Sequence, residues 1–484
     1  MVRRHSKSLG ALGLGFACFA VVSMVPRAVR ADPLPSSHFD IDVFQGALLT
    51  PIRVTSLGGA YAGFGEGIPG LVSNAAAASV REPFAAQHVE LSLSGSLSFP
   101  LGLGENNDFD NNGTKDADYS SFIYANAGAI VQVGAFGTGI EAELQTYTLT
   151  NDKDESSTVV LGRYHFLAGV SIAHGDLAIG GGARAVTLGF ATPDGGLAYA
   201  GVGPELGILV KPRSVPFRFG ATYRFPVSAA PLFARPPTDS DGRFRLGDFV
   251  LPESAFLPWE LEIGTAVQFG PRPLNLPFED PEDADDFVED AVSRARKDRE
   301  QLRERALASV PEEERDALRA KLDDEEAAYR TAEDDAAEAV ERRTEREADA
   351  RAKSLARPRL LLLFSVLATG EVSRGVSFEE FLAQPTDEPS THVIGSSGAS
   401  INFSPRFGVE VEAVPRLLVL RGGGYYEPSR FDRVGRQHGT SGLALKLFHT
   451  DFFGLLPDYD WGVELGVDLA PRYQSLSASL AVFR

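Results

Sequence analysis

The sequence predicts an all-β protein, a 14-stranded antiparallel transmembrane β-barrel. Three observations indicate this fold class: fourteen stretches alternate apolar with small or polar residues, a secretory signal precedes them, and no cysteine follows that signal. In residues 217–225 an apolar residue or alanine occupies every second position and would face lipid, whereas Arg218 and Arg224 would face the lumen. A closed barrel satisfies all its backbone hydrogen bonds between strands, so such strands can cross a bilayer.

Residues 1–31 read as a signal peptide. Basic residues open this stretch, an apolar run follows, and Ala31 ends a small-residue cleavage site. The only cysteine, Cys18, lies within it, so we expect neither disulfides nor thiol chemistry in the mature chain. No later apolar run approaches the roughly 20 residues that a membrane helix needs.

The net charge and the spacing of the histidines argue against nucleic-acid binding and against enzyme activity. The formal net charge of -20 makes nucleic acid an unsuitable partner, since phosphate would be repelled. The 8 histidines are scattered, with no His-x-x-x-His pair, and no Gly-x-Ser-x-Gly elbow is present. We therefore expect no enzyme activity and no cofactor. The expected surroundings are lipid and lipopolysaccharide of a Gram-negative outer membrane.

The strands divide into two groups, with strands 1–8 in residues 88–278 and strands 9–14 in residues 358–484. An even count returns the chain to its starting side, so both ends of the barrel should be periplasmic. By this parity the short connections lie on the periplasmic side, near 137, 174–175, 212–215 and 415. The long polar connections lie outside, at 100–120, 228–256, 372–399 and 428–439.

Residues 279–357 interrupt the barrel pattern. They contain no glycine and consist mostly of Ala, Glu, Asp and Arg, which favour helix, with opposite charges at helical spacings. Pro311 followed by three glutamates is placed as a helix start, so we expect a helical hairpin resembling a coiled coil. Strand parity puts this insertion in the periplasm. It is either a solvated charged spacer or a docking arm for a periplasmic protein partner.

Residues 32–87, between the signal and the first strand, are glycine-rich and too long for a simple leader. They contain Ser-Leu-Gly-Gly-Ala-Tyr-Ala-Gly at 56–63 and Ser-Asn-Ala-Ala-Ala at 73–77. This pattern resembles the N-terminal hatch of the outer-membrane long-chain fatty acid and aromatic hydrocarbon transporters, the FadL/TodX type. Residues 219–227 and 420–429 resemble strands of that family.

The resemblance implies a barrel of 14 strands plugged by the hatch. Its hatch or gating positions would be Leu57, Gly58, Gly59, Ala60, Tyr61, Asn74, Ala75 and Ala76. Ala75 departs from the pattern, because the family has proline there, in a motif that packs against a kink in the third strand. The function implied is passive uptake of long-chain fatty acids or hydrocarbons, loaded from outside into an apolar pocket and released through the hatch. The alternative is a structural, secretion or anchoring barrel that docks a periplasmic partner through the insertion.

Two further sets of residues are candidate binding sites. The predicted register turns many charges inward, where they would pair with one another; Arg184 and Arg218 could instead hold a substrate carboxylate, since guanidinium suits planar oxyanions. The loop at 108–118 places Asp108, Asp110, Asn112 and Asp116 at spacings typical of a calcium loop, with Gly113 sixth. Its last ligand position holds Tyr119, so a plain hydrophilic loop is the other interpretation.

Overall fold

The computed structural model describes residues 36–83, 88–100, 108–113, 121–151, 153–232, 236–277, 281–355, 357–385, 395–415, 417–431, 434–452 and 456–483. The predicted signal peptide lies outside these ranges. So do residues 32–35 and 84–87 of the predicted hatch.

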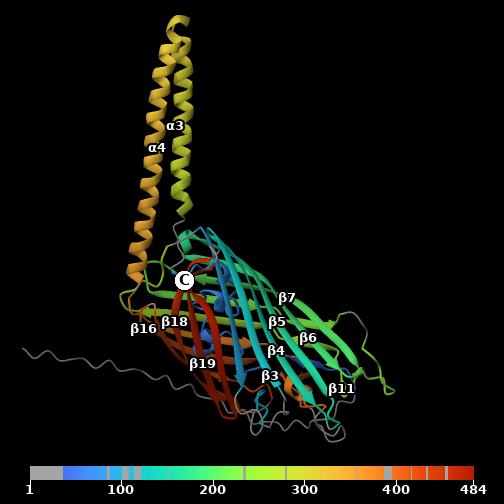
Figure 1. The fold of residues 1–484 in the computed structure, drawn as a ribbon. Helices are drawn as coiled ribbons and strands as arrows, with labels where there is room; N and C mark the ends of the chain where they lie inside the picture. Colours follow the sequence, from blue (N-terminus) through green and yellow to red (C-terminus); the bar gives the residue numbers. More distant parts are fainter. Residues whose placement is uncertain are drawn as a thin grey trace, which may run out of the picture.

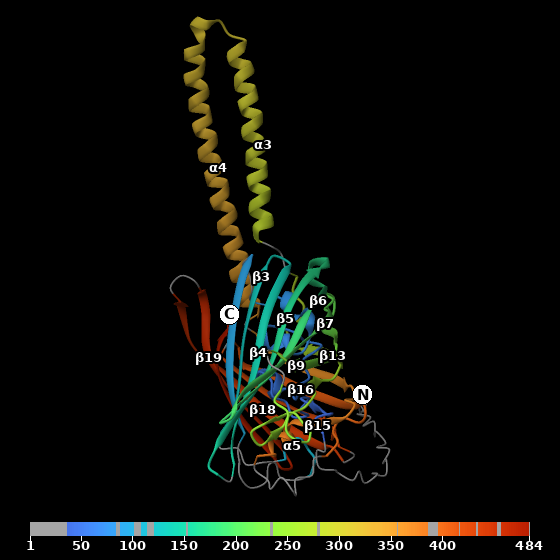
Figure 2. The same cartoon turned by 90° about the vertical axis from the view of Figure 1, so that its right-hand side faces the viewer.

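Fourteen strands form one closed antiparallel barrel, as the sequence predicts (Figures 1 and 2). The last strand pairs with the first, which closes the wall and leaves no free edge. The strands are β2 (Val89–Pro100), β3 (Ser121–Val133), β4 (Phe136–Thr150), β5 (Ser156–Ile172), β6 (Leu177–Thr192), β7 (Gly195–Val210), β8 (Phe217–Arg224), β13 (Glu260–Phe269), β14 (Leu360–Thr369), β16 (Asn402–Val414), β17 (Leu418–Glu427), β18 (Arg436–Phe452), β19 (Leu456–Ala470) and β20 (Tyr473–Phe483).

The alternation in the sequence becomes an apolar outer face and a polar inner one. On β8, Phe217 and Phe219 are each 37% exposed, whereas Arg218 is 2% exposed. The remaining strands repeat this pattern. Their exposed large apolar residues include Val133, Ile140, Phe166, Ile179, Leu206, Ile263, Phe364, Phe407, Leu465 and Leu480. An apolar belt on a closed barrel is the surface that a bilayer covers. In the described part of the chain no helix combines the length and apolar character needed to cross a membrane.

The two ends of the barrel differ. One end, here the short-turn end, carries brief connections between β3 and β4, β5 and β6, β7 and β8, and β16 and β17. The other, the long-loop end, carries the extended connections, which hold β9 (Val227–Pro231), β10 (Arg245–Leu246), β11 (Phe249–Val250), β12 (Ser254–Leu257), β15 (Gly375–Ser377) and α5 (Phe378–Leu382). The four short connections and the four long ones that strand parity assigned to opposite sides therefore lie at opposite ends, although the two-residue turns after β6 and β19 also lie at the long-loop end.

Two helices project from the short-turn end, α3 (Pro281–Ala308) and α4 (Glu312–Leu355), as Figures 1 and 2 show. They run antiparallel, and Arg299 joins them through ion pairs with Glu326 and Glu333. The hairpin leaves and re-enters the wall between paired residues, Phe269 and Leu360. The barrel wall is thus continuous on both sides of the insertion.

Residues 36–83, here the luminal segment, run inside the barrel. They form β1 (Asp40–Asp42), α1 (Ile52–Ser56), α2 (Ile68–Leu71) and the 3-10 helix η1 (Ala75–Ser79), and most of their side chains are buried. β1 pairs in parallel with β12 on one side and β15 on the other. The segment is therefore tied to two connections of the long-loop end.

Candidate functional site

Inward-facing glycines of the wall receive the backbone of the luminal segment. A Cβ built on Gly408 or Gly423 would meet Leu57 within 2.6 Å, and one on Gly264 would meet the backbone of Gly63 at 2.8 Å. Gly58 has φ +61° and lies against Gly424, so this turn needs glycine for its conformation as well as for space. The segment is seated by backbone-to-backbone contact that any wall side chain would block.

Asn74 anchors the end of the segment that carries the predicted hatch motif. Its amide nitrogen donates to the carbonyls of Ala62 at 2.9 Å and Ile208 at 3.1 Å. Its amide oxygen accepts from the N–H of Ala76 at 3.0 Å and so caps η1. One fully buried side chain thus connects two parts of the segment to β7.

Ala75 occupies the first position of η1, where the resemblance has proline. Its N–H lies 3.4 Å from the hydroxyl of Thr222 on β8. The motif faces glycines of β6, β7 and β8, and the third strand, β4, pairs with β5 over its whole length without a register shift. β4 therefore has no interruption of its pairing on either side at which the wall could open.

Buried ion pairs tie the segment to the wall. Glu66 pairs with Arg218 at 2.7 Å, and Arg53 binds Glu410 through two nitrogens at 2.9 and 3.0 Å. Burial alone would raise the pKa of Glu66, but Arg218, Arg359 and Arg53 together hold it below its ordinary value. The sequence reasoning did not single out Glu66 or Arg53. The sequence feature that could have identified them is a charged residue within an apolar, glycine-rich stretch.

The two arginines predicted to hold a substrate carboxylate both bind partners of the protein itself. Arg218 donates to Asn275 and to the carbonyls of Phe64 and Leu274, besides its pair with Glu66. A substrate carboxylate could reach this guanidinium only by displacing those partners. A headgroup role therefore remains a prediction.

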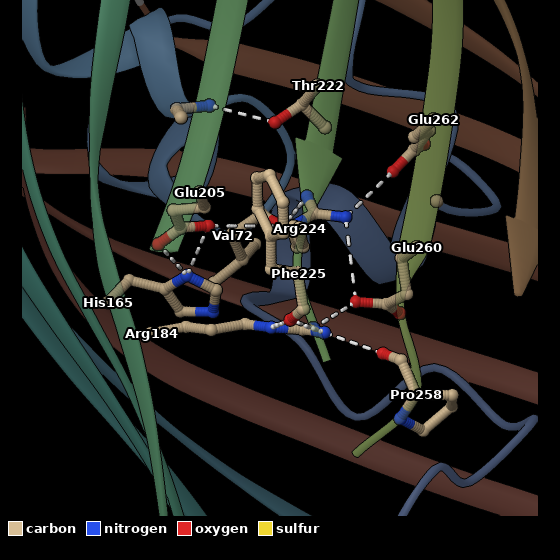
Figure 3. A network of polar contacts seen from close by, with 12 residues as sticks. Val72, His165, Arg184, Glu205, Thr222, Arg224, Phe225, Pro258, Glu260 and Glu262 are labelled. Atoms are coloured by element: carbon tan, nitrogen blue, oxygen red, sulfur yellow. Dashed lines mark hydrogen bonds and ion pairs between the residues drawn. The ribbon is translucent and has the colours of Figure 1, made fainter. Parts of the chain in front are cut away.

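Arg184 lies in a polar network on the inner wall (Figure 3). It pairs with Glu260 at 2.5 Å and donates to the carbonyls of Phe225 and Pro258. It also lines a cavity of about 100 Å³, whose other walls include residues 44–50 of the luminal segment. The acidic and basic lining residues are Glu143, Arg163, His165, Arg184, Arg224, Glu260, Glu262 and Arg406.

Toward the long-loop end the inward-facing residues change from charged to apolar. On β6, Arg184 is followed by inward-facing Val186, Leu188 and Phe190, and β3, β4 and β5 change in the same way. Together with residues of the luminal segment and the loops they form the outer apolar cluster, which includes Ile41, Val43, Phe122, Tyr124, Tyr147, Leu149, Val159, Leu161, Val186, Leu188, Phe190, Phe249, Phe378 and Phe381. The lumen therefore has an apolar outer part above a charged middle layer.

The candidate calcium loop makes its own hydrogen bonds. Both carboxylate oxygens of Asp108 accept from backbone N–H groups, those of Asn112 and Gly113. Asp110 accepts from Asn112 and from the hydroxyl of Ser377. Asp116 lies outside the described residues, and within the described ranges no three His, Cys, Asp or Glu side chains are grouped to hold a metal. These carboxylate oxygens already accept hydrogen bonds from the turn and from Ser377, so the calcium site stays a prediction.

Comparison with known proteins gives fold neighbours only. No protein-family profile and no curated sequence matches the chain. Among solved structures it is similar to the monoaromatic hydrocarbon channel CymD, at 11% identity over 90% of this chain and 96% of that one, with a TM-score of 0.41. It is also similar to the toluene transporter TbuX of Ralstonia pickettii, at 11% identity over 91% of this chain and 98% of that one, with a TM-score of 0.43.

The toluene transporter TodX of P. putida gives 11% identity over 92% of this chain and 98% of that one, with a TM-score of 0.43. These neighbours are channels of the type that the sequence resembles. The chain is a closed, 14-stranded, antiparallel β-barrel with its own N-terminal segment in the lumen, and the three solved chains named above are described as a hydrocarbon channel and two toluene transporters.

Proposed function

We propose that the protein is a passive outer-membrane channel for hydrophobic molecules, either long-chain fatty acids or hydrocarbons. The observation that supports this most is the outer apolar cluster. The lumen of an aqueous barrel is polar, because water fills it. Here the adjacent strands β3 to β6 turn apolar side chains inward at the long-loop end. Such a surface suits a hydrophobic molecule that arrives from outside the cell.

Burial of the substrate supplies the affinity. Each buried CH₂ group gains about 0.8 kcal/mol, so a long acyl chain needs no charged contact to bind. Entry requires residues 39–43 or the α5 connection to move, since they fill the space between the apolar strands. Rearrangement of the luminal segment then releases the molecule. The contacts that hold Leu57–Tyr61 and Asn74–Ala76 against the wall control this release.

Equilibrium binding of oleate and toluene to the purified protein tests this proposal. Leu188→Gln puts an amide into the outer apolar cluster and should weaken binding of both ligands by about tenfold or more. Gly189→Ala changes the next residue, which lies on the outer face with open space beside it, and is the matched control. Absence of binding by the unmodified protein, or equal behaviour of the two variants, would refute the proposal.

A carboxylate-holding role of Arg218 is tested in the same assay. Arg218→Met should weaken oleate binding far more than toluene binding if the guanidinium holds the headgroup. Equal losses for the two ligands would mean that Arg218 supports the luminal segment instead.

A second candidate function is that of an anchoring or secretion barrel, which the projecting α3–α4 hairpin favours. Its helices have charged, exposed faces, and they stand at the end opposite the apolar cluster (Figure 2). Replacing residues 285–350 by a short linker keeps the paired strand ends and separates the candidates. Loss of a bound periplasmic protein, with barrel assembly and ligand binding intact, would favour docking, whereas no change in any of the three would leave the hairpin as a spacer.

A further inference from the structure

The chain enters the α3–α4 hairpin through residues 271–277, here the stem, which follow β13 at the short-turn end. Leu274 and Asn275 of the stem are 3% and 6% exposed, although they belong to a connection between a strand and a projecting helix. Prolines at 271, 273 and 277 each fix the backbone φ, so the stem is stiff. Movement of α3 should therefore reach the buried residues of the stem.

Asn275 fixes the stem to the wall. Its amide nitrogen donates, over 2.8 to 3.0 Å, to three carbonyls at the turn between β7 and β8, those of Pro212, Val215 and Phe217. Its amide oxygen accepts from the Nε of Arg218 at 2.8 Å. One buried amide thus ties the stem to a turn and to an inward-facing side chain of β8.

Glu412 of β16 joins the two ends of the hairpin. Arg272 of the stem pairs with it, and so does Arg359, which follows α4, at 3.6 Å. Leu355, at the end of α4, is fully buried. The guanidinium of Arg359 also lies 5.9 Å from the ring centroid of Phe64 in the luminal segment. Both ends of the hairpin are therefore anchored beside the lumen.

The stem touches the luminal segment directly. Leu274 packs in a second cluster, here the inner apolar cluster, which also contains Val54, Leu57, Ala60, Tyr61, Phe64, Ala266, Leu361 and Leu363. Arg218 adds polar contacts to this packing. On the luminal side it pairs with Glu66 and donates to the carbonyl of Phe64. On the stem side it donates to Asn275 and to the carbonyl of Leu274. One buried guanidinium holds the stem and the luminal segment together.

Withdrawal of the stem would weaken the hold on the luminal segment in two ways. Arg218 would lose two of its acceptors in a place where water cannot replace them, and an unpaired buried donor is costly. The inner apolar cluster would lose Leu274, which leaves a cavity beside Leu57 and Phe64. The stem and the luminal segment should therefore leave the wall together.

The hairpin is suited to carry a load to the stem. α4 has 44 residues and is about 66 Å long (Figure 2). Both helices are rich in charged residues, which is typical of helices that bridge through solvent. Ion pairs connect them at successive levels, between Arg296 and Glu333, Arg299 and Glu326, and Arg303 and Asp323. A displacement of the turn between the helices is thus passed to their base.

We propose that the α3–α4 hairpin is a lever through which a load applied at the short-turn end unseats the luminal segment, with Leu274 and Asn275 as the coupling residues. A periplasmic protein bound to the hairpin supplies the load. The stem is drawn away, Arg218 loses its two stem acceptors, and residues 53–66 come off the wall. The use of this opening to release a hydrophobic molecule rests on the proposed channel function, whereas the opening itself does not.

A pulling experiment tests the lever. The chain after the signal has no cysteine, so Ser309→Cys, in the exposed turn between α3 and α4, takes a single biotin. A streptavidin-coated magnetic bead then loads the hairpin of the full-length protein while potassium chloride conductance is recorded across a planar bilayer. Conductance should rise by at least about tenfold under load and fall back when the load is removed.

The matched control carries a flexible Gly-Ser linker inserted after Pro277, so that a load on α3 no longer tightens the stem. With the same biotin and bead, this variant should conduct no more under load than without it. Equal opening of the control would overturn the coupling, and so would a parent protein that stays closed until the barrel leaves the bilayer. Salt is the only solute, so failure here is distinct from failure of the channel to carry oleate.

Substitutions in the stem test the same contact without a load. Leu274→Ala empties part of the inner apolar cluster and should speed protease cleavage of residues 36–83 by at least about tenfold. Leu276→Ala is the matched control, because Leu276 is only partly buried and lies outside that cluster. Coupling acts in both directions, so Glu66→Gln should speed hydrogen exchange of the Leu274 and Asn275 amides. Equal cleavage of the two leucine variants, or unchanged exchange in the stem, would contradict the coupling.

Discussion

Glu66 of the luminal segment and Arg218 of β8 form a buried ion pair with 2.7 Å between carboxylate and guanidinium. Each side chain is almost completely enclosed, at 4% and 2% exposure. The pair fixes a glycine-rich turn of the luminal segment to the wall. Because breaking a buried pair leaves a charge without compensation, this contact should control how firmly the lumen is closed.

Removing the arginine of this pair should loosen the luminal segment. Arg218→Met leaves Glu66 buried without the guanidinium that pairs with it directly, and such losses typically cost about 3–5 kcal/mol. We expect faster cleavage of residues 36–83 by added protease while the barrel stays folded. Adding Glu66→Gln to Arg218→Met removes the stranded charge and should recover part of the loss; a double variant as loose as the single one would contradict the assignment.

Acid should loosen the segment through the same pair. The pKa of Glu66 in the folded protein lies below its ordinary value of 4.5, so its contribution to stability is complete above that pH and is lost as the pH falls through the folded value. Protease sensitivity of the segment should therefore rise with acidification below about pH 4.5. Glu66→Gln should flatten this part of the pH profile, and an unchanged profile would assign the effect to other carboxylates.

The glycines of the wall should be required for the seat of the segment. A Cβ on Gly220 would lie 2.1 Å from the carbonyl oxygen of Ala62 and 2.8 Å from the amide nitrogen of Asn74. Gly220→Val should therefore unseat the segment and open a conducting pore in planar bilayers. Gly439→Val is the control, since nothing lies within 4 Å of a Cβ there. Equal conductance of the two variants would contradict the role of Gly220 in making room for the luminal segment.

Ala75→Pro should be tolerated. Proline suits the first position of a helix, and Asn74 before it already has the extended conformation, φ -149° and ψ 123°, that a following proline requires. The only bond lost is the long one to Thr222. We expect thermal stability of the folded barrel to change by less than about 1 kcal/mol. A large destabilisation would mean that the seat is tighter around Ala75 than these contacts indicate.

The wall could be predicted from the sequence because its signal is local. Two-residue alternation, as in residues 217–225, marks each strand without knowledge of its neighbours. Parity then separates long from short connections, and the charged stretch around Pro311 marks the helices. The inward-facing charges, including Arg184 and Arg218, followed from the same alternation.

The candidate site could not be predicted in the same way, since it depends on register between strands. Arg184 and Glu260 lie far apart in the sequence and become neighbours only when the strands take their places in the wall. The Glu66–Arg218 contact likewise joins residues far apart in the chain. A kink in the third strand was implied by family resemblance rather than by the residues of β4, which alternate regularly to its end.

The most direct test of the channel is comparison of oleate and glucose transfer across lipopolysaccharide-containing proteoliposomes. With its lumen occupied by residues 36–83 and its outer part apolar, the protein should speed oleate transfer and leave glucose transfer at the rate of empty vesicles. Rapid glucose transfer, or oleate transfer no faster than without protein, would contradict a channel for hydrophobic molecules.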